Sequence, residues 1–153
     1  MDAALNQPIP YLLSPCGFDM ISCGPIERRD KGDPLWVSKK LSGRKLLLQD
    51  AMRVQARTSP EEMEQAAKAV AEKLNQYQHK RLVQFIIPIK GFSSLSMEGG
   101  ALYDPPSDEA FVHSLRKNLD PEVKIVEVDA DINSREFAQA VVRALGESLK
   151  AKA

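Results

Sequence analysis

Hydrophobic residues recur at helical spacing in three segments of the chain. The longest segment begins at Ser59, a good N-cap residue, and Glu62 three residues later completes a capping box. Pro60 fits the first helical position, where its missing N–H costs no hydrogen bond. The pattern predicts a helix over residues 60–78, closed by basic residues at 79–81 that suit the negative end of a helix dipole. Its apolar face comprises Met63, Ala66, Ala67, Val70, Leu74 and Tyr77.

The two other helical segments lie in the C-terminal part of the chain. A helix is predicted over residues 108–119 and ends at Asp120-Pro121. Ser134 caps a last helix, and the Ala/Lys tail at 150–153 is expected to fray. The apolar faces of these helices comprise Phe111, Val112, Leu115 and Leu119, and then Phe137, Val141, Leu145 and Leu149.

Four apolar runs that are too short for helices predict strands, at Ile9–Leu13, Lys45–Leu48, Leu82–Ile89 and Val123–Val128. The third run is nearly continuous, which is typical of a strand covered on both faces. Because strands alternate with amphipathic helices, the predicted fold class is α/β with a mainly parallel sheet. We expect one three-layer α/β/α domain, Rossmann-like or flavodoxin-like, over residues 1–153. Residues 14–25 and 27–40 are predicted to be loop-rich, with order only at Leu35–Val37.

The composition excludes several classes of protein. The chain has 153 residues, of which 43% are hydrophobic and 27% charged, so it is globular rather than disordered. Its 21 Lys and Arg residues balance 21 Asp and Glu residues, which removes the electrostatic footprint of a nucleic-acid binder. No apolar run approaches the roughly 20 residues of a membrane helix. We therefore expect no nucleic acid and no membrane among its partners.

The N-terminus and the cysteines favour a cytoplasmic location. Residues 1–10 contain neither a basic residue nor an apolar core, so they do not resemble a secretory signal or a transit peptide. Cys16 and Cys23 lack the paired spacing of a zinc site and are too few for a disulfide framework. We expect two reduced thiols.

The loops that follow the predicted strands are where a ligand would bind, because ligands of open parallel sheets lie outside the carboxyl ends of the strands. The loop 90–104 is the richest of them. Its glycines would let backbone N–H groups approach a phosphate, its hydroxyls add donors, and its lysine adds a positive charge. The alternative is a plain connection whose glycines only serve turns. The candidate binding residues are Lys90, Gly91, Ser93, Ser94, Gly99 and Gly100.

Two carboxylates are weak candidates for acid–base chemistry. Asp19 could bind a ligand hydroxyl or a metal-bound water, or it could instead tie down its own loop through local hydrogen bonds. Asp104 is the last residue of the candidate phosphate loop and is the second titratable group. The alternating Asp129, Asp131 and Asn133 resemble the opening of a calcium loop, but its glycine and distal glutamate are absent, so no metal is predicted.

The histidines and the tryptophan carry weaker signals. His79 at a helix terminus and His113 beside an apolar stripe are expected to be structural and surface residues, respectively. Trp36, alone in a polar stretch, is either a loop or interface anchor or a stacking platform.

Four stretches of the sequence, in this order, resemble the C-terminal half of the Tm-one-like ATP-binding family. This is an uncharacterised bacterial and fungal family (protein family zero-two-six-one) that shares its domain with a plant tobamovirus-resistance protein. The chain departs from the family at Glu98, where a proline is common, at Gln49-Asp50-Ala51, in place of a His-Asn-Pro-like turn, and at Asp131, in place of a histidine. The stretches are Ser14-Pro15-Cys16-Gly17-Phe18-Asp19-Met20 with Gly24-Pro25, Thr58-Ser59-Pro60-Glu61-Glu62, Ile87-Pro88-Ile89-Lys90-Gly91-Phe92-Ser93-Ser94-Leu95 with Gly99-Gly100 and Tyr103-Asp104-Pro105, and Asp131-Ile132-Asn133 with Phe137-Ala138.

The resemblance implies a protein of two Rossmann-like domains, of which this chain would be the second. Its partner would be the missing N-terminal domain or a separate chain, and ATP would bind together with that domain. Self-association into a homo-oligomer is also expected, because an incomplete α/β sandwich leaves an apolar face. We expect a nucleotide-associated domain that forms one side of an interdomain cleft. The alternatives are half of an enzyme acting on a small phosphorylated or carboxylated metabolite, or a dimerisation domain, so whether the chain is enzymatic stays open.

Overall fold

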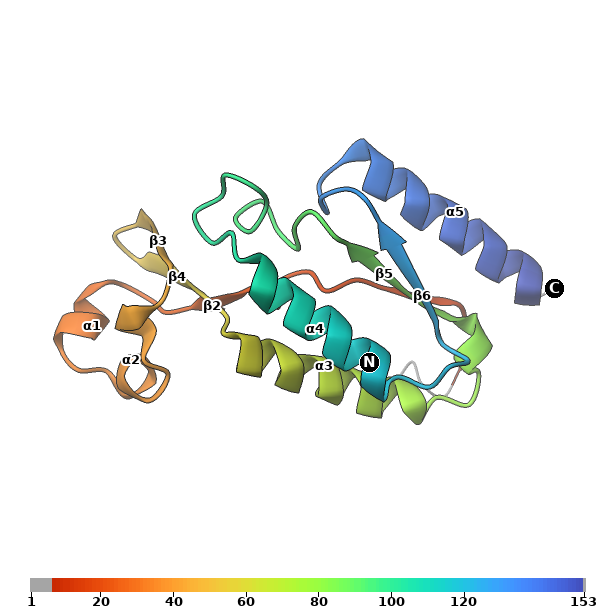
Figure 1. Cartoon of the computed structure of the whole chain (residues 1–153), viewed down its shortest axis with the longest axis horizontal. Helices are drawn as coiled ribbons and strands as arrows, with labels where there is room; N and C mark the ends of the chain where they lie inside the picture. The colour runs from red at the N-terminus through yellow and green to blue at the C-terminus, as the bar shows by residue number, and fades with distance from the viewer. Residues whose placement is uncertain (1–6, 153) are drawn as a thin grey trace.

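A computed structural model describes residues 7–152 and contains two three-stranded sheets. The parallel sheet consists of β1 (Tyr11–Leu13), β5 (Val83–Pro88) and β6 (Lys124–Val128), in the order β1-β5-β6. The antiparallel sheet consists of β2 (Met20–Ser22), β4 (Arg53–Arg57) and β3 (Leu46–Asp50), in that order. The antiparallel sheet lies at one end of the molecule and the parallel sheet occupies the rest (Figure 1).

The parallel sheet is sandwiched between helices on both faces. Every residue of β5 is buried, and its side chains alternate between two cores. Phe85 packs with α3 (Pro60–Asn75) and α4 (Pro105–Asn118), whereas Ile86 packs beneath α5 (Arg135–Lys152). This arrangement confirms the predicted α/β class with its parallel sheet and three layers.

Phe111 of α4 joins the loops to the main core. Its ring lies 5.5 Å, centroid to centroid, from Phe18, 6.0 Å from Phe85 and 5.8 Å from Phe92. Phe18 belongs to the loop after β1, and Phe92 belongs to the loop after β5. One buried aromatic side chain therefore fixes both loops against the same helix.

The antiparallel sheet corrects one sequence prediction. The segment 45–48 was expected in the parallel sheet, but it forms β3, which pairs antiparallel with β4 through a tight turn. At this turn the Asp50 carboxylate accepts a hydrogen bond from the Met52 N–H at 2.9 Å. Strands β2 and β4 were not predicted, because one has only three residues and the other, Arg-Val-Gln-Ala-Arg, begins and ends with arginine.

A small second core supports this sheet. It includes residues of the predicted loop-rich region, where α1 (Glu27–Asp30) and α2 (Pro34–Ser38) form, and of the 3-10 turn η1 (Leu41–Gly43) that follows. The Trp36 indole is 3% exposed and its N–H donates to the Cys23 carbonyl at 3.1 Å, so this residue is the loop anchor of the two roles considered. Both cysteines are free thiols. The core comprises Cys23, Trp36, Leu41, Val54 and Ala56.

The helix boundaries differ from the predicted ones in ways that have local causes. Helix α3 ends at Asn75 rather than 78, and Tyr77 turns back into the core, where its hydroxyl donates to the Ile9 carbonyl at 3.0 Å. The chain then makes the 3-10 turn η2 (Lys80–Leu82). Helix α4 begins at Pro105, three residues before the predicted start. Helix α5 runs to Lys152, and the last residue of the Ala/Lys tail lies outside the described residues.

The predicted capping box at the start of α3 is confirmed. The Ser59 hydroxyl accepts from the Glu62 N–H at 3.3 Å, and the Glu62 carboxylate accepts from the Ser59 N–H at 3.1 Å. Arg44 and Lys39 also bind Glu62, at 2.6 Å and 2.9 Å. Burial opposes ionisation of Glu62, but these hydrogen bonds outweigh it and lower its pKa to about 2. Glu62 therefore also ties the segment before β3, which carries Lys39 and Arg44, to α3.

We predict that Ser59→Ala lowers the free energy of unfolding by about 1 kcal/mol, because it removes the side-chain half of the capping box. In a domain of this size, the melting temperature should fall by roughly 2–4 °C. Thermal unfolding followed by circular dichroism measures the shift. Ser42→Ala, at an exposed position in η1, is the matched control and should leave the melting temperature within about 1 °C of the wild type.

Candidate ligand cleft and the charge network beside it

A cleft of about 1070 Å³ lies at the carboxyl ends of β5 and β6. The loop 90–104 and helix α4 form much of its wall, and Ile89 after β5, Glu127 of β6 and Asp131 after β6 complete it. This is the edge of a parallel sheet where ligands are expected to bind. The lining residues are Ile89, Lys90, Phe92, Met97, Glu98, Tyr103, Pro105, Asp108, Glu109, Val112, His113, Arg116, Glu127 and Asp131.

The walls of this cleft combine apolar side chains with an excess of carboxylates. Five of its lining residues are acidic and two are cations, apart from His113. Both cations already have a carboxylate partner, since Lys90 lies 3.0 Å from Asp129 and Arg116 lies 2.6 Å from Glu127. The cleft therefore offers hydrogen-bond acceptors and apolar surface more readily than free positive charge.

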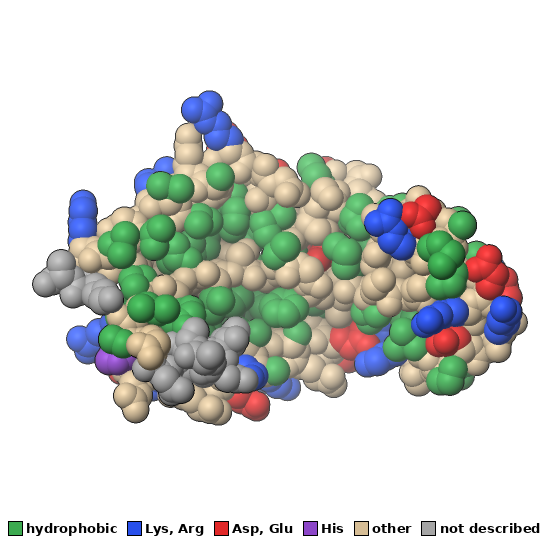
Figure 2. Space-filling model, turned by 180° about the vertical axis from the view of Figure 1, so that it is seen from behind, with side chains coloured by type: hydrophobic (Ala, Val, Ile, Leu, Met, Phe, Trp, Pro, Cys, Tyr) green, Lys and Arg blue, Asp and Glu red, His purple; other side chains and the backbone are tan. Residues whose placement is uncertain are grey.

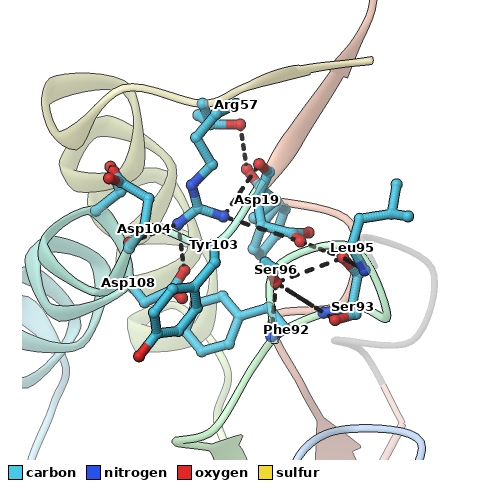
Figure 3. A network of polar contacts seen from close by, with 12 residues as sticks. Asp19, Arg57, Phe92, Ser93, Leu95, Ser96, Tyr103, Asp104 and Asp108 are labelled. Atoms are coloured by element: carbon cyan, nitrogen blue, oxygen red, sulfur yellow. Dashed lines mark hydrogen bonds and ion pairs between the residues drawn. The ribbon is translucent and has the colours of Figure 1, made fainter. Parts of the chain in front are cut away.

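Beside the cleft, Arg57 joins four segments that are distant in sequence (Figure 3). The residue ends β4, and its side chain is 4% exposed. Its guanidinium donates to the carboxylate of Asp108 on α4, to the Asp19 carbonyl at 3.1 Å and to the Asp104 carbonyl at 3.3 Å. The Asp19 carboxylate lies 3.9 Å from the same guanidinium and accepts a hydrogen bond from the Ser93 hydroxyl. A single arginine thus binds the loop after β1, the loop after β5 and the start of α4.

Asp108 has an unusual proton affinity for an aspartate. Burial raises its pKa, the Arg57 guanidinium lowers it, and the nearby Asp19 and Asp104 carboxylates raise it again, to a final value of about 6. Its side chain is 15% exposed and lines the cleft. Asp108 can therefore gain or lose a proton near neutral pH at the surface of the cleft.

The pKa of Asp104, a candidate from the sequence, is shifted in the opposite direction. Burial opposes its ionisation, but hydrogen bonds from Ser107 and Lys45 outweigh that effect and lower its pKa. The Lys45 ammonium lies 3.0 Å from its carboxylate. Asp104 is therefore ionised over the physiological range and paired. Asp19 is fully buried, which fits its alternative role of tying down its loop. The acid–base roles of both residues stay predictions.

The loop 90–104 is held closed by its own hydrogen bonds. The Ser96 hydroxyl accepts from the N–H groups of Phe92 and Ser93, at 3.2 and 3.1 Å. Gly91 has a φ of +145°, and a Cβ at this position would lie 2.8 Å from the Met97 Cα. A Cβ at Gly100 would lie closer still to its neighbour, the Leu95 carbonyl oxygen. These glycines are required for close packing of the loop on itself.

The predicted phosphate-binding residues are consequently spread over different environments. Lys90 lines the cleft, whereas the Ser93 hydroxyl points to Asp19. Ser94 and Gly99 are exposed, and neither lines the cleft. The assignment of this loop to phosphate stays a prediction, and Lys90 is the one of its six residues that lines the cleft.

Several residues of the site were missed in the sequence. Arg57 lies in an unpredicted strand, and Asp108 lies in the first turn of α4, outside the stretches that were singled out in the sequence. His113 was expected on the surface; it is exposed and also lines the cleft. The spacing of Asp108, Val112 and Arg116 by four places them on one helix face, and this was the available signal.

Within residues 7–152, no group of three or more His, Cys, Asp or Glu side chains could hold a metal ion. No helix there is both long and apolar enough to span a bilayer.

Comparison with known proteins supports the resemblance noted in the sequence. The model of a family described as "Uncharacterised protein family (UPF0261) C-terminal domain" matches residues 1–149. A UPF0261 protein of Clostridium tetani is 32% identical over 146 residues, which are 95% of this chain and 34% of the relative. One from Rhizobium meliloti is 31% identical over 144 residues, 93% of this chain and 34% of the relative. The ToMV resistance protein Tm-1(GCR237) of Solanum lycopersicum is 30% identical over 145 residues, 92% of this chain and 18% of that protein. The chain spans about a third of the length of these two bacterial relatives.

We predict that Arg57→Ala is severely destabilising, because it leaves the buried Asp19 and Asp108 carboxylates without their cation. Loss of one member of a buried pair costs about 3–5 kcal/mol. Arg53→Ala on the same strand removes an exposed ion pair with Asp50 and should cost less than about 1 kcal/mol. Urea unfolding of the two variants measures the contrast, and equal destabilisation would contradict the role given to Arg57.

The raised pKa of Asp108 predicts a pH dependence of stability. Between about pH 4 and pH 6 its carboxyl is protonated in the folded chain and ionised in the unfolded chain. Its contribution to stability is therefore complete below this window and falls as the pH rises through it. The free energy of unfolding of the wild type relative to Asp108→Asn should drop across the window by on the order of 1–3 kcal/mol. Urea titrations at successive pH values measure this difference, and a constant difference would contradict the prediction.

Proposed function

The chain belongs to the uncharacterised protein family UPF0261 and matches its C-terminal domain, and on this premise we propose that it is a ligand-binding α/β domain that forms one side of a cleft for a nucleotide-type ligand. The observation that carries the proposal is the position of the cleft at the carboxyl edge of β5 and β6, where parallel sheets bind their ligands. Its volume of about 1070 Å³ is at the upper end of small-molecule sites, which leaves room for a ligand of nucleotide size.

The lining of the cleft suits the nucleoside part of such a ligand. Ile89, Phe92 and Val112 offer apolar surface for a planar base. Carboxylates such as Asp131 and Glu109 accept hydrogen bonds, as ribose hydroxyls and an exocyclic amine require. We therefore assign the base and the ribose to this wall.

The phosphates of the ligand would need positive charge from elsewhere. Lys90 is bound to Asp129, but its side chain is 60% exposed, so it can turn toward a phosphate at the rim of the cleft at little cost. The opposite side would be supplied by a polypeptide equivalent to the rest of the longer relatives. ATP is the ligand that we propose, with this chain contributing the nucleoside side.

A second candidate function is enzymatic, and Asp108 is the observation that favours it. A carboxyl group with a pKa of about 6 on a cleft wall is suited to donate and accept protons near neutral pH. Release of phosphate from ATP by the chain, lost in Asp108→Asn, would support this function. ATP that stays intact while it binds would leave the protein as a binding domain.

We predict that ATP and adenosine each raise the melting temperature of the chain, whereas inorganic tripolyphosphate does not. Lys90→Ala should reduce the shift with ATP at least twofold and leave the shift with adenosine unchanged. Lys68→Ala, at an exposed position on α3 away from the cleft, is the matched control. Equal shifts with ATP in Lys90→Ala and the wild type would remove Lys90 from the site.

A blocking variant tests the cleft itself. Ile89 is 50% exposed at the cleft wall, and Ile89→Trp should fill part of the cleft and abolish the adenosine shift. Val37→Trp, at a 65% exposed position on α2 outside the cleft, should retain it. If both variants bind adenosine like the wild type, the ligand does not occupy this cleft.

A further inference from the structure

Helix α5 carries a second apolar stripe that the sheet does not cover. Its buried face comprises Phe137, Ala140, Ala144 and Ser148, which pack on the sheet. The second stripe comprises Ala138, Val142, Leu145 and Leu149, spaced four, three and four residues apart. Val142 is 70% exposed, Leu145 42% and Leu149 53%. This spacing is the one by which helices pack along a seam.

The stripe is part of a larger apolar surface. Figure 2, which shows the face of the molecule opposite to that of Figure 1, displays hydrophobic side chains gathered over the region of α5 and β1. Leu12 of β1 packs with the α5 core but is only partly buried, and Ile9 just before this strand is 42% exposed. A contiguous apolar patch of this kind marks an interaction site.

Strand β1 borders this surface and has a free edge. It pairs with β5 on one side, and no other strand among residues 7–152 pairs with its other side. A free edge presents a row of backbone donors and acceptors to which another strand can pair. An apolar helix stripe and an open strand edge therefore lie on the same side of the molecule.

The topology of the sheet indicates what would fit there. The crossovers from β1 through α3 to β5, and from β5 through α4 to β6, pass over one face and advance away from the free edge. Because such crossovers are right-handed, helices on the opposite face connect strands that advance the other way, beyond β1. A strand beside β1 and a helix beside α5 would thus extend this sheet into a doubly wound one.

We propose that the free edge of β1 and the apolar stripe of α5 dock an α/β segment equivalent to the part of the relatives that this chain does not match. That part is about two-thirds of each of the two bacterial relatives, which is ample for such a segment. It adds a parallel strand to β1 and lays the apolar face of a helix against α5. This docking is independent of which ligand the cleft binds.

Strand direction favours this occupant over a second copy of the chain. The exposed side of α5 carries charges of both signs, Arg135, Arg143 and Lys150 together with Glu136 and Glu147, so charge does not separate the two occupants. Two copies related by a two-fold axis would pair their β1 edges antiparallel. The continuation that the crossover rule indicates is instead a parallel strand with its helix.

Co-expression of this chain with the unmatched two-thirds of the Clostridium tetani relative, as a tagged separate polypeptide, tests the proposal. We expect the two to copurify in a 1:1 complex, with its mass measured by light scattering. The double substitution Val142→Glu and Leu145→Glu should weaken the complex at least tenfold while the chain alone keeps its melting temperature within about 2 °C, since both positions are exposed. Val37→Glu, an exposed apolar position on α2, is the control and should leave the complex intact.

Two results would overturn the proposal. In one, the chain alone is a homodimer of about twice its 17.0 kDa mass, and the double substitution dissociates it; the stripe then binds a second copy. In the other, the chain stays monomeric and fails to copurify, or the double substitution leaves the complex intact; the stripe and the edge of β1 are then not a docking site for this segment.

Discussion

The structure depends on the burial of one guanidinium group among carboxylates and carbonyls. Arg57 is the last residue of β4, and its side chain reaches the loop after β1, the carbonyl of Asp104 and the carboxylate of Asp108. A buried charge is tolerated only where it is paired and hydrogen-bonded, so each of these segments must approach Arg57 in a defined position. The geometry of the cleft follows from this constraint, because α4 and the loop 90–104 form its walls.

The buried Arg57 lies between two neighbouring aspartates whose pKa values are shifted in opposite directions. Asp104 is bound by Lys45 and Ser107 and its pKa is lowered, whereas Asp108 is more deeply buried and its pKa is raised to about 6. Both share Arg57, and one cation cannot fully compensate both of them together with Asp19. The residue with the raised pKa is the one that lines the cleft. A network that holds the fold together thus also leaves one carboxyl group able to exchange protons at the wall of the cleft.

The two faces of the parallel sheet are covered to different extents. The face under α3 and α4 is closed by a large core that includes Phe85, Phe92 and Phe111. The other face is covered by α5 alone, which leaves one flank of the helix exposed beside the free edge of β1. The cleft and this open flank therefore present separate surfaces, with acceptors and apolar side chains in the first and an apolar stripe in the second.

The sequence alone determined the elements whose hydrophobic pattern is strong and local. These are the capped helix α3, the buried strand β5, helix α5 and the α/β class. It also indicated the edge of the sheet where the cleft lies, because the polar loops follow the strands. The antiparallel sheet escaped prediction because its strands are short and polar at their ends, and their pairing is set by contacts between distant residues.

Only the tertiary structure decided which polar groups form the site. Arg57, Asp108 and Ser93 are distant in sequence, and nothing in their local patterns specifies that a guanidinium from β4 meets a carboxylate of α4. Proton affinity was likewise undetermined, since it depends on burial and on neighbouring charges rather than on residue type. Local periodicity determined the helices and strands. Contacts between residues distant in sequence determined which charged groups are buried, and therefore which of them could carry chemistry.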